Sequence, residues 1–370
     1  MRSLILITLL CFSLAVYSQG SGDSWNIFRG SPELSGRTSE ELPDNPVLLW
    51  SVATGASTKS SPVISDGLIY FGNDKGELIA VTTEGRIKWR HKGDDPLEAP
   101  PLVAGSKIIF STSSGVLKAA DKTNGRVIWE YDTGNQIAGS ANTFSAGGRS
   151  YVFVGSYDYN LHCVDSETGK PLWKVETENY INGTPALSGS RIIFGGCDGI
   201  IRVVNPMTGL QSDTANIGIY LAASPAIFSN RAVFGDYDGS VYCLDISTKK
   251  KVWVIQGDAD AGAILSIPAI GNGLAFIGSE DKYLYCYNLS NGQLRWKYRT
   301  NGRIIGSPVI SPRKVIVPSM DKNVYILSQA DGSKLWSFNA GAPVGSSPAV
   351  AGNRFYILTD DGRLLAFGKK

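Results

Sequence analysis

The side chains best suited to acid–base or metal chemistry are scarce in this sequence. Only two histidines, His91 and His162, occur in 370 residues. Two histidines are too few to build a typical histidine-based catalytic group or metal centre. We therefore expect both to be packing or surface residues. The five cysteines contain no Cys-x-x-Cys pair, so their spacing indicates no metal site. Cys197, in the turn Gly-Gly-Cys-Asp-Gly, is the thiol that we expect to be most reactive.

A second group of candidate residues is rich in tyrosine and lies between residues 157 and 237. Tyrosine combines a large apolar ring with one polar group, which suits surfaces that bind a peptide or a glycan. The candidate partner-binding residues are five tyrosines with polar side chains among them: Tyr157, Tyr159, Asn179, Tyr180, Asn182, Tyr220, Asp236 and Tyr237. The alternative is that these tyrosines only fill the ends of structural repeats. Both interpretations depend on the structural repeats that carry these tyrosines.

Those elements are repeats of about forty residues, and Ser266–Trp296 shows the unit. A short strand with Pro268 opens it, and further strands are predicted over Leu274–Gly278 and Tyr283–Asn288. A polar turn at Asn291-Gly292 then leads to an outer strand that ends at Trp296. Four short strands separated by turn residues form one small antiparallel sheet. Such a sheet cannot bury both of its faces alone, so copies of it must stack.

The repeat can be counted from the prolines that open the units and the tryptophans that close them. The openers are Pro62, Pro101, Pro185, Pro225, Pro268, Pro308 and Pro348, with Asn142 assigned to the remaining slot. The closers are Trp50, Trp89, Trp129, Trp173, Trp253, Trp296 and Trp336, with Asp213 in the slot of an eighth. Successive gaps of 39, 40, 44, 40, 40, 43 and 40 residues are typical of propeller blades.

We therefore predict an all-β fold, an eight-bladed β-propeller of four-stranded antiparallel blades over residues 46–370. The last unit, Ser346–Phe367, has no fourth strand, whereas Trp50 has no first three strands before it. We expect Val47–Val52 to supply the outer strand of the final blade, because ring closure removes two exposed sheet edges. The junction at Asp213, which lacks a tryptophan, is predicted to be the weakest.

Positions in the third strand form columns from unit to unit. One column is small and includes Cys163, Cys243 and Cys286, which alternate with Ala, Val and Ile in the other units. We expect these cysteines to be small buried hydrophobes that form no disulfides. The neighbouring column, which contains His162, varies freely, and this predicts a less constrained face. Small residues beside the opening prolines, such as Ser61, are predicted to fit a narrow central channel.

Residues 1–18 have the composition of a secretory signal peptide. A single arginine precedes the apolar core Leu4–Val16, which is too short to span a bilayer. We expect cleavage between Ser18 and Gln19 and a periplasmic or secreted protein. The residues before Cys11 match a lipid-attachment motif poorly, so we expect no lipid anchor there.

Residues 19–45 match no strand pattern and form an N-terminal leader. We expect it to cross one face of the ring, with Trp25 and Phe28 as its anchors. A net charge of +2, from 35 basic and 33 acidic residues, leaves no basic patch. We therefore expect a monomer that neither binds nucleic acid nor spans a membrane.

Two motifs carry a resemblance to a known family. Units end in Gly-x-x-x-Trp, as at Gly125–Trp129, and open with Ser-Pro-x-Ile, as at Ser61–Ile64. This pattern resembles the pyrroloquinoline-quinone (PQQ) repeat propellers and lacks the Gly-His and Trp-Asp signatures of WD40 repeats. The leader motif Trp-x-x-Phe-Arg-Gly at Trp25–Gly30 looks like the opening of exported members. The family includes quinoprotein alcohol dehydrogenases and non-enzymatic relatives such as BamB, a propeller subunit of the outer-membrane β-barrel assembly machine.

The resemblance to the dehydrogenases can be tested residue by residue. Those enzymes stack their quinone on two adjacent cysteines, and this sequence has no Cys-Cys pair. They also hold a calcium ion with carboxylate and amide groups. The carboxylates in loops before first strands form no matched ligand set: Asp94, Asp95, Glu98, Asp258 and Asp260. We expect no catalytic residue, cofactor or metal, with a PQQ- and calcium-dependent dehydrogenase as an alternative.

These observations favour an exported, non-enzymatic propeller that binds or scaffolds a protein partner in the cell envelope. The resemblance to BamB implies a role in outer-membrane protein assembly. A propeller that binds a carbohydrate or another small ligand at the mouth of its channel is the other alternative.

Overall fold

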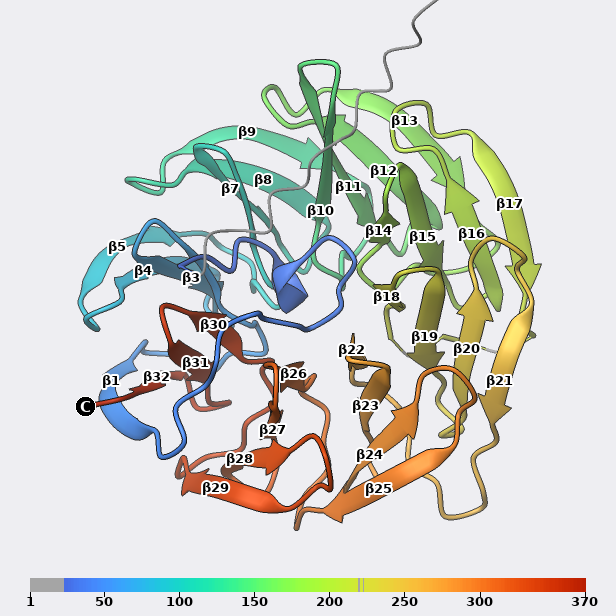
Figure 1. The fold of residues 1–370 in the computed structure, drawn as a ribbon. Coiled ribbons are helices and arrows are strands. Elements are labelled where there is room, and N and C mark those ends of the chain that lie inside the picture. The colour runs from blue at the N-terminus through green and yellow to red at the C-terminus, as the bar shows by residue number, and fades with distance from the viewer. Residues whose placement is uncertain (1–22, 219, 222) are drawn as a thin grey trace, which may run out of the picture.

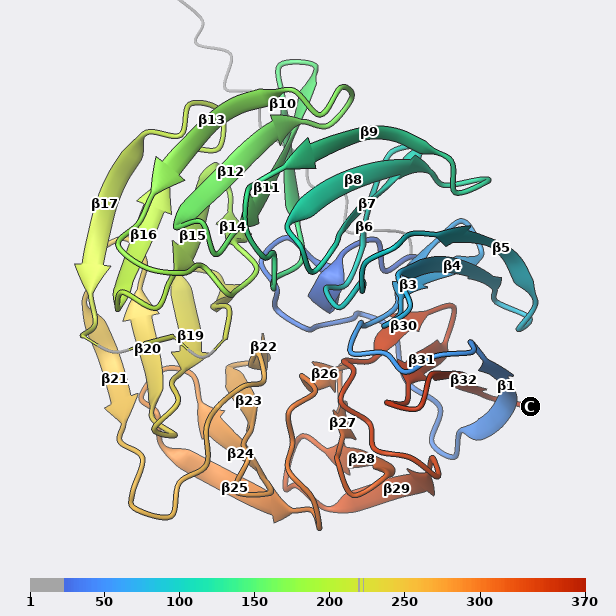
Figure 2. The same cartoon turned by 180° about the vertical axis from the view of Figure 1, so that it is seen from behind.

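The computed structural model describes residues 23–218, 220–221 and 223–370, which form a closed ring of eight four-stranded antiparallel sheets (Figures 1 and 2). The eight-bladed propeller predicted from the repeat is confirmed. We number the blades 1 to 8 in the order of their innermost strands. The predictions about the signal peptide and Cys11 concern residues outside the described part of the chain.

Each of the first seven blades is built from four strands that follow one another from the channel outwards. Blade 1 contains β2 (Val63–Ser65), β3 (Leu68–Gly72), β4 (Glu77–Thr82) and β5 (Ile87–Lys92). Blade 2 contains β6 (Leu102–Ala104), β7 (Lys107–Ser111), β8 (Val116–Asp121) and β9 (Val127–Asp132). Blade 3 contains β10 (Asn142–Ala146), β11 (Arg149–Gly155), β12 (Asn160–Asp165) and β13 (Pro171–Glu176). Blade 4 contains β14 (Ala186–Ser188), β15 (Arg191–Gly195), β16 (Ile200–Val204) and β17 (Gln211–Asn216).

The second half of the ring repeats this plan. Blade 5 contains β18 (Ala226–Phe228), β19 (Arg231–Gly235), β20 (Val241–Asp245) and β21 (Lys251–Ile255). Blade 6 contains β22 (Ala269–Gly271), β23 (Leu274–Gly278), β24 (Tyr283–Asn288) and β25 (Leu294–Arg299). Blade 7 contains β26 (Val309–Ile310), β27 (Lys314–Pro318), β28 (Asn323–Ser328) and β29 (Lys334–Asn339).

Blade 8 closes the ring by joining the two ends of the fold. Its inner strands are β30 (Ala349–Ala351), β31 (Arg354–Leu358) and β32 (Arg363–Gly368), and its outer strand is β1 (Val47–Ala53). β1 pairs antiparallel with β32, and Trp50 lies opposite Ala366. The carboxyl terminus consequently lies beside β1 (Figure 1). The predicted closing strand is confirmed, because residues 47–52 lie within β1.

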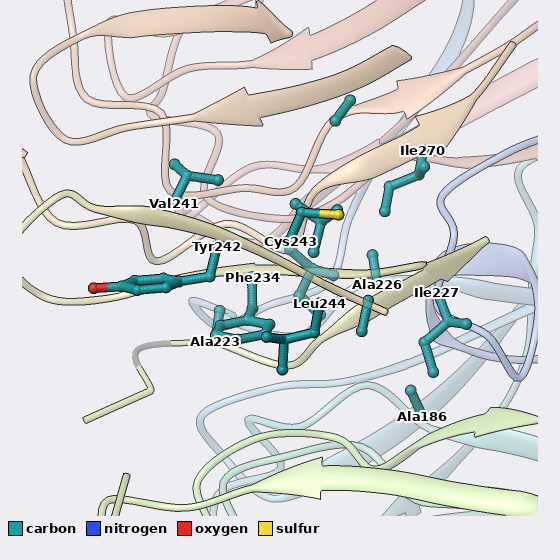
Figure 3. Packing of buried hydrophobic residues seen from close by; sticks show 14 of the residues in the cluster. Ala186, Ala223, Ala226, Ile227, Phe234, Val241, Tyr242, Cys243, Leu244 and Ile270 are labelled. Atoms are coloured by element: carbon teal, nitrogen blue, oxygen red, sulfur yellow. The ribbon is translucent and has the colours of Figure 1, made fainter. Parts of the chain in front are cut away.

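The register of the sheets explains why one third-strand column is small. In every blade the small residue lies directly opposite the closing position of the outer strand, as Cys163 lies opposite Trp173 and Val203 opposite Asp213. Cys243 is fully buried among the aliphatic side chains of blades 4 to 6 (Figure 3). Cys163, Cys243 and Cys286 are buried free thiols, as expected.

The same register corrects one assignment. In blade 3, Asn142 pairs with Phe153, and in blade 4, Ala186 pairs with Ile193 at the equivalent position. Ala186 directly follows Pro185, just as Asn142 directly follows Ala141. Ala141, and not Asn142, therefore takes the proline slot of blade 3. The one-residue error arose because blade 3 has no proline to fix the position.

Each closing tryptophan reaches over to the next blade. Its indole N–H donates to a backbone carbonyl in the turn between the third and fourth strands of that blade, as from Trp50 to Thr83 at 2.9 Å and from Trp129 to Ser166 at 3.1 Å. Trp336 is different, because no such turn follows β32. It packs edge-on against Phe355 and Phe367 of blade 8, with ring centroids 5.9 and 5.5 Å apart.

Small hydroxyl residues beside the opening prolines link neighbouring blades. Backbone N–H groups at this position donate to the hydroxyl of the equivalent residue in the next blade: Ser140 to Thr184, Thr184 to Ser224, Ile267 to Ser307, Ser307 to Ser347 and Ser347 to Ser61. These residues were expected only to fit a narrow channel. Their hydroxyls also accept hydrogen bonds from buried N–H groups, which would otherwise carry a desolvation cost.

The prediction that the variable third-strand column lies on a less constrained face is wrong. His162, Arg202, Tyr242 and Tyr325 are each at most 6% exposed. Their polar groups bond to an aspartate in the turn that precedes their own strand, as the Tyr325 hydroxyl does to Asp321 at 2.6 Å. The column varies in residue type because several side chains can fill this space and still reach the carboxylate.

The leader crosses the middle of the ring, where the 3₁₀ turn η1 (Phe28–Gly30) lies over the channel in both views (Figures 1 and 2). Trp25, expected as an anchor, is 4% exposed, whereas Phe28 is only partly buried. Arg29 and Leu34, which were not expected as anchors, are almost fully buried. Within the described ranges, no helix is long and apolar enough to cross a membrane.

Candidate functional site

The turns between second and third strands and the loops that enter first strands lie at one end of the channel. In seven blades the second residue of the turn donates its N–H to a carbonyl of the adjoining loop: Asp74 to Ser57, Ser113 to Pro96, Tyr157 to Gln136, Cys197 to Tyr180, Glu280 to Ala263, Met320 to Arg303 and Asp360 to Pro343. The leader, in contrast, bonds near the hairpin turns that join first and second strands, at the other end. The candidate residues therefore share one rim that the leader leaves open.

Three of the candidate tyrosines form a stack on blade 3 and the loop after it. The rings of Tyr157 and Tyr180 are nearly parallel, with centroids 4.6 Å apart. The Tyr159 ring is tilted against that of Tyr180, with centroids 5.2 Å apart. Tyr159 and Tyr180 stay 41% and 40% exposed. Two tyrosines from one turn and one from the next loop thus present a continuous aromatic surface.

Cys197 and Tyr237 extend this surface towards blade 5. Tyr157, Cys197 and Tyr237 occupy the same turn position in blades 3, 4 and 5. Burial raises the pKa of the Tyr157 hydroxyl, and its neighbours Cys197, Tyr237 and Tyr180 raise that pKa further. The Asn182 amide donates to the Tyr237 hydroxyl at 3.5 Å. Cys197 was not predicted as a member of this group, although alignment of the turns places it between the two tyrosines.

The environment of Cys197 does not favour a reactive thiol. Burial raises its pKa, and the carboxylate of Asp198 raises it further. A cysteine acts as a nucleophile only as its thiolate, which a raised pKa disfavours. Cys163, Cys243 and Cys286 are buried more deeply, so Cys197 is still the most accessible of the four described thiols, as expected. Its raised pKa keeps it mainly in the protonated form.

Tyr220 lies apart from the stack and lines a pocket with Tyr237. The pocket has a volume of about 430 Å³ and also borders Asn216, Asp236 and Asp238. Tyr220 and Tyr237 are 63% and 50% exposed. Both rings are therefore available to a bound molecule, on loops from two different blades.

Two of the candidate residues serve the protein itself. Asp236 is 2% exposed, and its carboxylate accepts hydrogen bonds from the Ser240 N–H at 2.7 Å and the Tyr242 hydroxyl at 3.0 Å. The Asn179 side chain accepts from the Tyr180 N–H and donates to the Cys197 carbonyl. Both residues hold the loops that carry the tyrosines, and we do not count them among the surface that meets a partner.

The two histidines have structural roles. His162 is 3% exposed, with one ring nitrogen 3.0 Å from Asp158 and the other 2.9 Å from the Tyr131 hydroxyl. His91 lies on β5 with its ring near Phe110. Neither side chain belongs to the rim.

A quinone and calcium do not fit the residues present. In the described ranges, no three or more His, Cys, Asp or Glu side chains are grouped so that they could hold a metal ion. The chain has no adjacent cysteine pair to support a quinone ring. Because both parts of the expected donor set are missing, we derive no reaction step through this cofactor.

Three overlapping segments, residues 45–146, 133–256 and 237–370, match the family model described as outer membrane protein assembly factor BamB. Together they cover the whole ring. The chain belongs to the BamB family. BamB of Kangiella koreensis is 28% identical over 151 residues, which are 40% of this chain and 38% of that protein. The quinohemoprotein alcohol dehydrogenase ADH-IIG of Pseudomonas putida is 28% identical over 124 residues, 30% of this chain and 17% of that enzyme. The chain thus spans less than two fifths of the length of these curated relatives.

Solved structures show the same fold. BamB from Moraxella catarrhalis superposes with a TM-score of 0.73 at 19% identity, covering 88% of this chain and 98% of that chain. A europium-containing methanol dehydrogenase superposes with a TM-score of 0.78 at 13% identity, covering 95% and 99%. At such identities the likeness concerns the fold alone. Neither of these relatives supports the glycan-binding alternative.

Proposed function

We propose that this chain is an exported scaffold of the cell envelope that works in outer-membrane protein assembly and holds a partner protein at its rim. The contact surface consists of Tyr157, Tyr159, Tyr180, Asn182, Tyr220 and Tyr237, and we call it the tyrosine surface. Membership of the BamB family supports the role in assembly. The gathering of five tyrosines from three blades at the open rim carries the choice of surface.

The physical character of the tyrosine surface suits a protein partner. Aromatic rings that are already packed on one another lose little conformational freedom on binding. Their hydroxyls and the Asn182 amide offer hydrogen bonds at the edge of an apolar contact. Interface energy usually concentrates in a few residues of this kind.

Site-specific photocrosslinking tests the proposal. A photoreactive phenylalanine analogue at Tyr220 should crosslink an outer-membrane assembly component in native envelopes. The same analogue at Leu335, on the outer strand of blade 7 and 45% exposed, is the control and should not. Crosslinks from Leu335 but none from Tyr220 would contradict the proposed surface.

A double variant tests the contribution of the tyrosines. Tyr157→Ala with Tyr237→Ala should abolish capture of the partner while the melting temperature stays close to that of the parent. Tyr283→Ala, at the start of the third strand of blade 6 and outside the tyrosine surface, is the matched control and should leave capture intact. Unchanged capture by the double variant would remove the tyrosine surface from consideration.

We further propose that the scaffold performs no reaction of its own. The misfit of the quinone and calcium donor set supports this. Equilibrium dialysis with PQQ and calcium checks it directly: we expect no saturable binding. Tight binding of the quinone would favour the dehydrogenase alternative instead.

A further inference from the structure

The leader is hydrogen-bonded to all eight blades. In six blades the N–H two residues after the opening proline donates to a leader carbonyl at 2.8–2.9 Å: Ile64 to Trp25, Val103 to Asn26, Leu187 to Pro32, Ile227 to Glu33, Ile270 to Ser35 and Ile310 to Gly36. In blade 3 the Asn142 amide donates to the Pro32 carbonyl at 2.8 Å. In blade 8 the Glu40 carboxylate accepts from the N–H groups of Gly352 and Asn353.

Apolar side chains of the leader enter separate parts of the core. Trp25 and Leu42 pack in the cluster around blades 1, 7 and 8, Ile27 in the cluster of blades 2 and 3, and Leu34 in that of blades 4 to 6. All four are at most 5% exposed. One short segment therefore contributes to the packing of distant sectors of the ring.

Arg29 lies at the centre of the leader and is 1% exposed. Its guanidinium donates to the carbonyls of Pro308 at 2.5 Å and Pro268 at 3.0 Å. No carboxylate in the described ranges forms an ion pair with it, and residues 1–22, 219 and 222 contain no Asp or Glu. Full burial lowers its pKa to about 9. The two proline carbonyls thus accept from the two terminal nitrogens of a buried charge, whereas its Nε is buried without a hydrogen-bond partner among the described residues.

Two glycines make the fit specific to this sequence. A Cβ on Gly36 would lie 1.9 Å from the Arg29 guanidinium, and one on Gly30 would lie 2.5 Å from the Trp25 ring. Both glycines also have positive φ angles, of +62° and +78°. The leader therefore folds onto itself through two side chain–glycine contacts.

These contacts are those of an extended peptide bound to exposed strand edges. Innermost strands of a propeller present unpaired N–H groups to the channel, and a peptide in an extended or turn conformation can supply the missing acceptors. Only the segment after Glu40 connects the leader covalently to β1. We propose that the inner edges at this end of the channel are a peptide-binding site, and that the leader is its resident ligand and stays bound without its covalent link.

The site would accept a peptide with tryptophan, an aliphatic residue and Arg-Gly in the order found at Trp25–Gly30. This inference is independent of the tyrosine surface, which lies at the other end of the channel.

A cut in the full-length protein tests the inference. A protease recognition sequence is inserted between Asp44 and Asn45, which are both exposed. After cleavage of the folded protein, size-exclusion chromatography with mass spectrometry determines whether the leader fragment elutes with the ring. We expect nearly complete co-elution. Separation of the fragment during the first column run would overturn the proposal.

Variants identify the contacts that retain the fragment. Trp25→Ala with Arg29→Ala should weaken retention at least about 100-fold, because anchor residues dominate such interfaces. Ser39→Ala, at an exposed position, should leave retention unchanged. If the double variant does not fold, Gly36→Ala, which displaces the guanidinium and strains the backbone at its positive φ, takes its place and should also weaken retention. Retention of the variant fragment as firm as that of the parent would overturn the assignment of anchors.

Discussion

Asp213 of blade 4 and Lys249 of blade 5 form an ion pair where six of the other junctions place a tryptophan on a glycine. The tryptophan–glycine contacts are Trp50–Gly85, Trp89–Gly125, Trp129–Gly169, Trp173–Gly209, Trp253–Gly292 and Trp296–Gly332. Lys249 takes the glycine position and keeps its positive φ, at 57°. Both positions of this contact therefore differ from their counterparts at the six other junctions, and an ion pair occupies the place of a packed ring.

The junction between blades 4 and 5 should open first. A partly exposed ion pair contributes less than a packed indole ring and is screened by salt. In native-state hydrogen exchange, we expect amides of β17 to exchange faster than those of the other outer strands. Earlier opening of another blade would contradict this.

Restoring the common pair should strengthen that junction. Asp213→Trp combined with Lys249→Gly should slow exchange in β17 roughly tenfold. Asp213→Trp alone should achieve less, because the equivalent glycines lie so close to the ring that a Cβ would be only 2.6–2.8 Å from it. Equal effects of the single and double variants would show that the two positions are independent.

Loss of the Trp50 side chain should destabilise the closure of the ring at blade 8. Trp50 belongs to the closing strand, packs near Tyr356 and donates to the Thr83 carbonyl of blade 1. Trp50→Ala should lower the free energy of unfolding by about 3 kcal/mol, near the low end for loss of a large aromatic side chain because the ring is partly exposed. Trp50→Phe, which keeps a ring but loses the N–H, should cost about 1 kcal/mol. Urea unfolding measures both, with Ser51→Ala on the same strand as control.

The hydroxyl of Ser347 should contribute to stability because it accepts a hydrogen bond from the Ser307 N–H. Ser347→Ala leaves the buried Ser307 N–H without its acceptor at 3.0 Å, which should cost about 1–3 kcal/mol of unfolding free energy. Ser347→Thr should be nearly neutral, because Thr184 accepts the same bond in blade 4. Equal losses in the two variants would point to packing instead of the hydrogen bond.

The ionisation of Asp198 should make the stability of the folded protein depend on pH in the acid range. Its side chain and that of Arg202 are 2% and 6% exposed, with 2.6 Å between the carboxylate and guanidinium. Burial pushes the pKa of Asp198 upwards, but bonds from Arg202 and the Ile200 N–H outweigh this and leave the pKa below its usual value. The folded state therefore binds fewer protons than the unfolded chain, whose aspartate pKa is about 3.9. Stability from this pair is present above about pH 4 and is lost as pH falls through the lower folded value.

Asp198→Asn tests this relation. The variant should be less stable than the parent at pH 7, and the difference should shrink below about pH 4, where the parent loses the charge of Asp198. Asp260→Asn, in an exposed loop, is the control and should follow the parent throughout. A constant difference between Asp198→Asn and the parent from pH 7 to pH 2 would contradict the assignment.

Much of the candidate site could be located from the sequence, but its composition could not. The repeat placed Tyr157, Tyr180 and Tyr237 at one rim, because each turn is fixed by its own strands. It could not show that the Asp236 carboxylate turns inwards to the Tyr242 hydroxyl, or that the rings of Tyr157 and Tyr180 stack. Those contacts depend on side-chain rotamers and on the packing of each loop against the neighbouring turn, which the repeat period does not specify.

The sequence alone determined the number of blades and the closing strand, because proline, glycine and tryptophan act locally and recur at a fixed period. Only the tertiary structure decided how the blades are joined at the centre. The link from Ser347 to Ser61 and the contact of Arg29 with Pro308 join residues hundreds of positions apart. Such bonds arise when the ring closes and inner edges converge on one axis, so no local pattern encodes them.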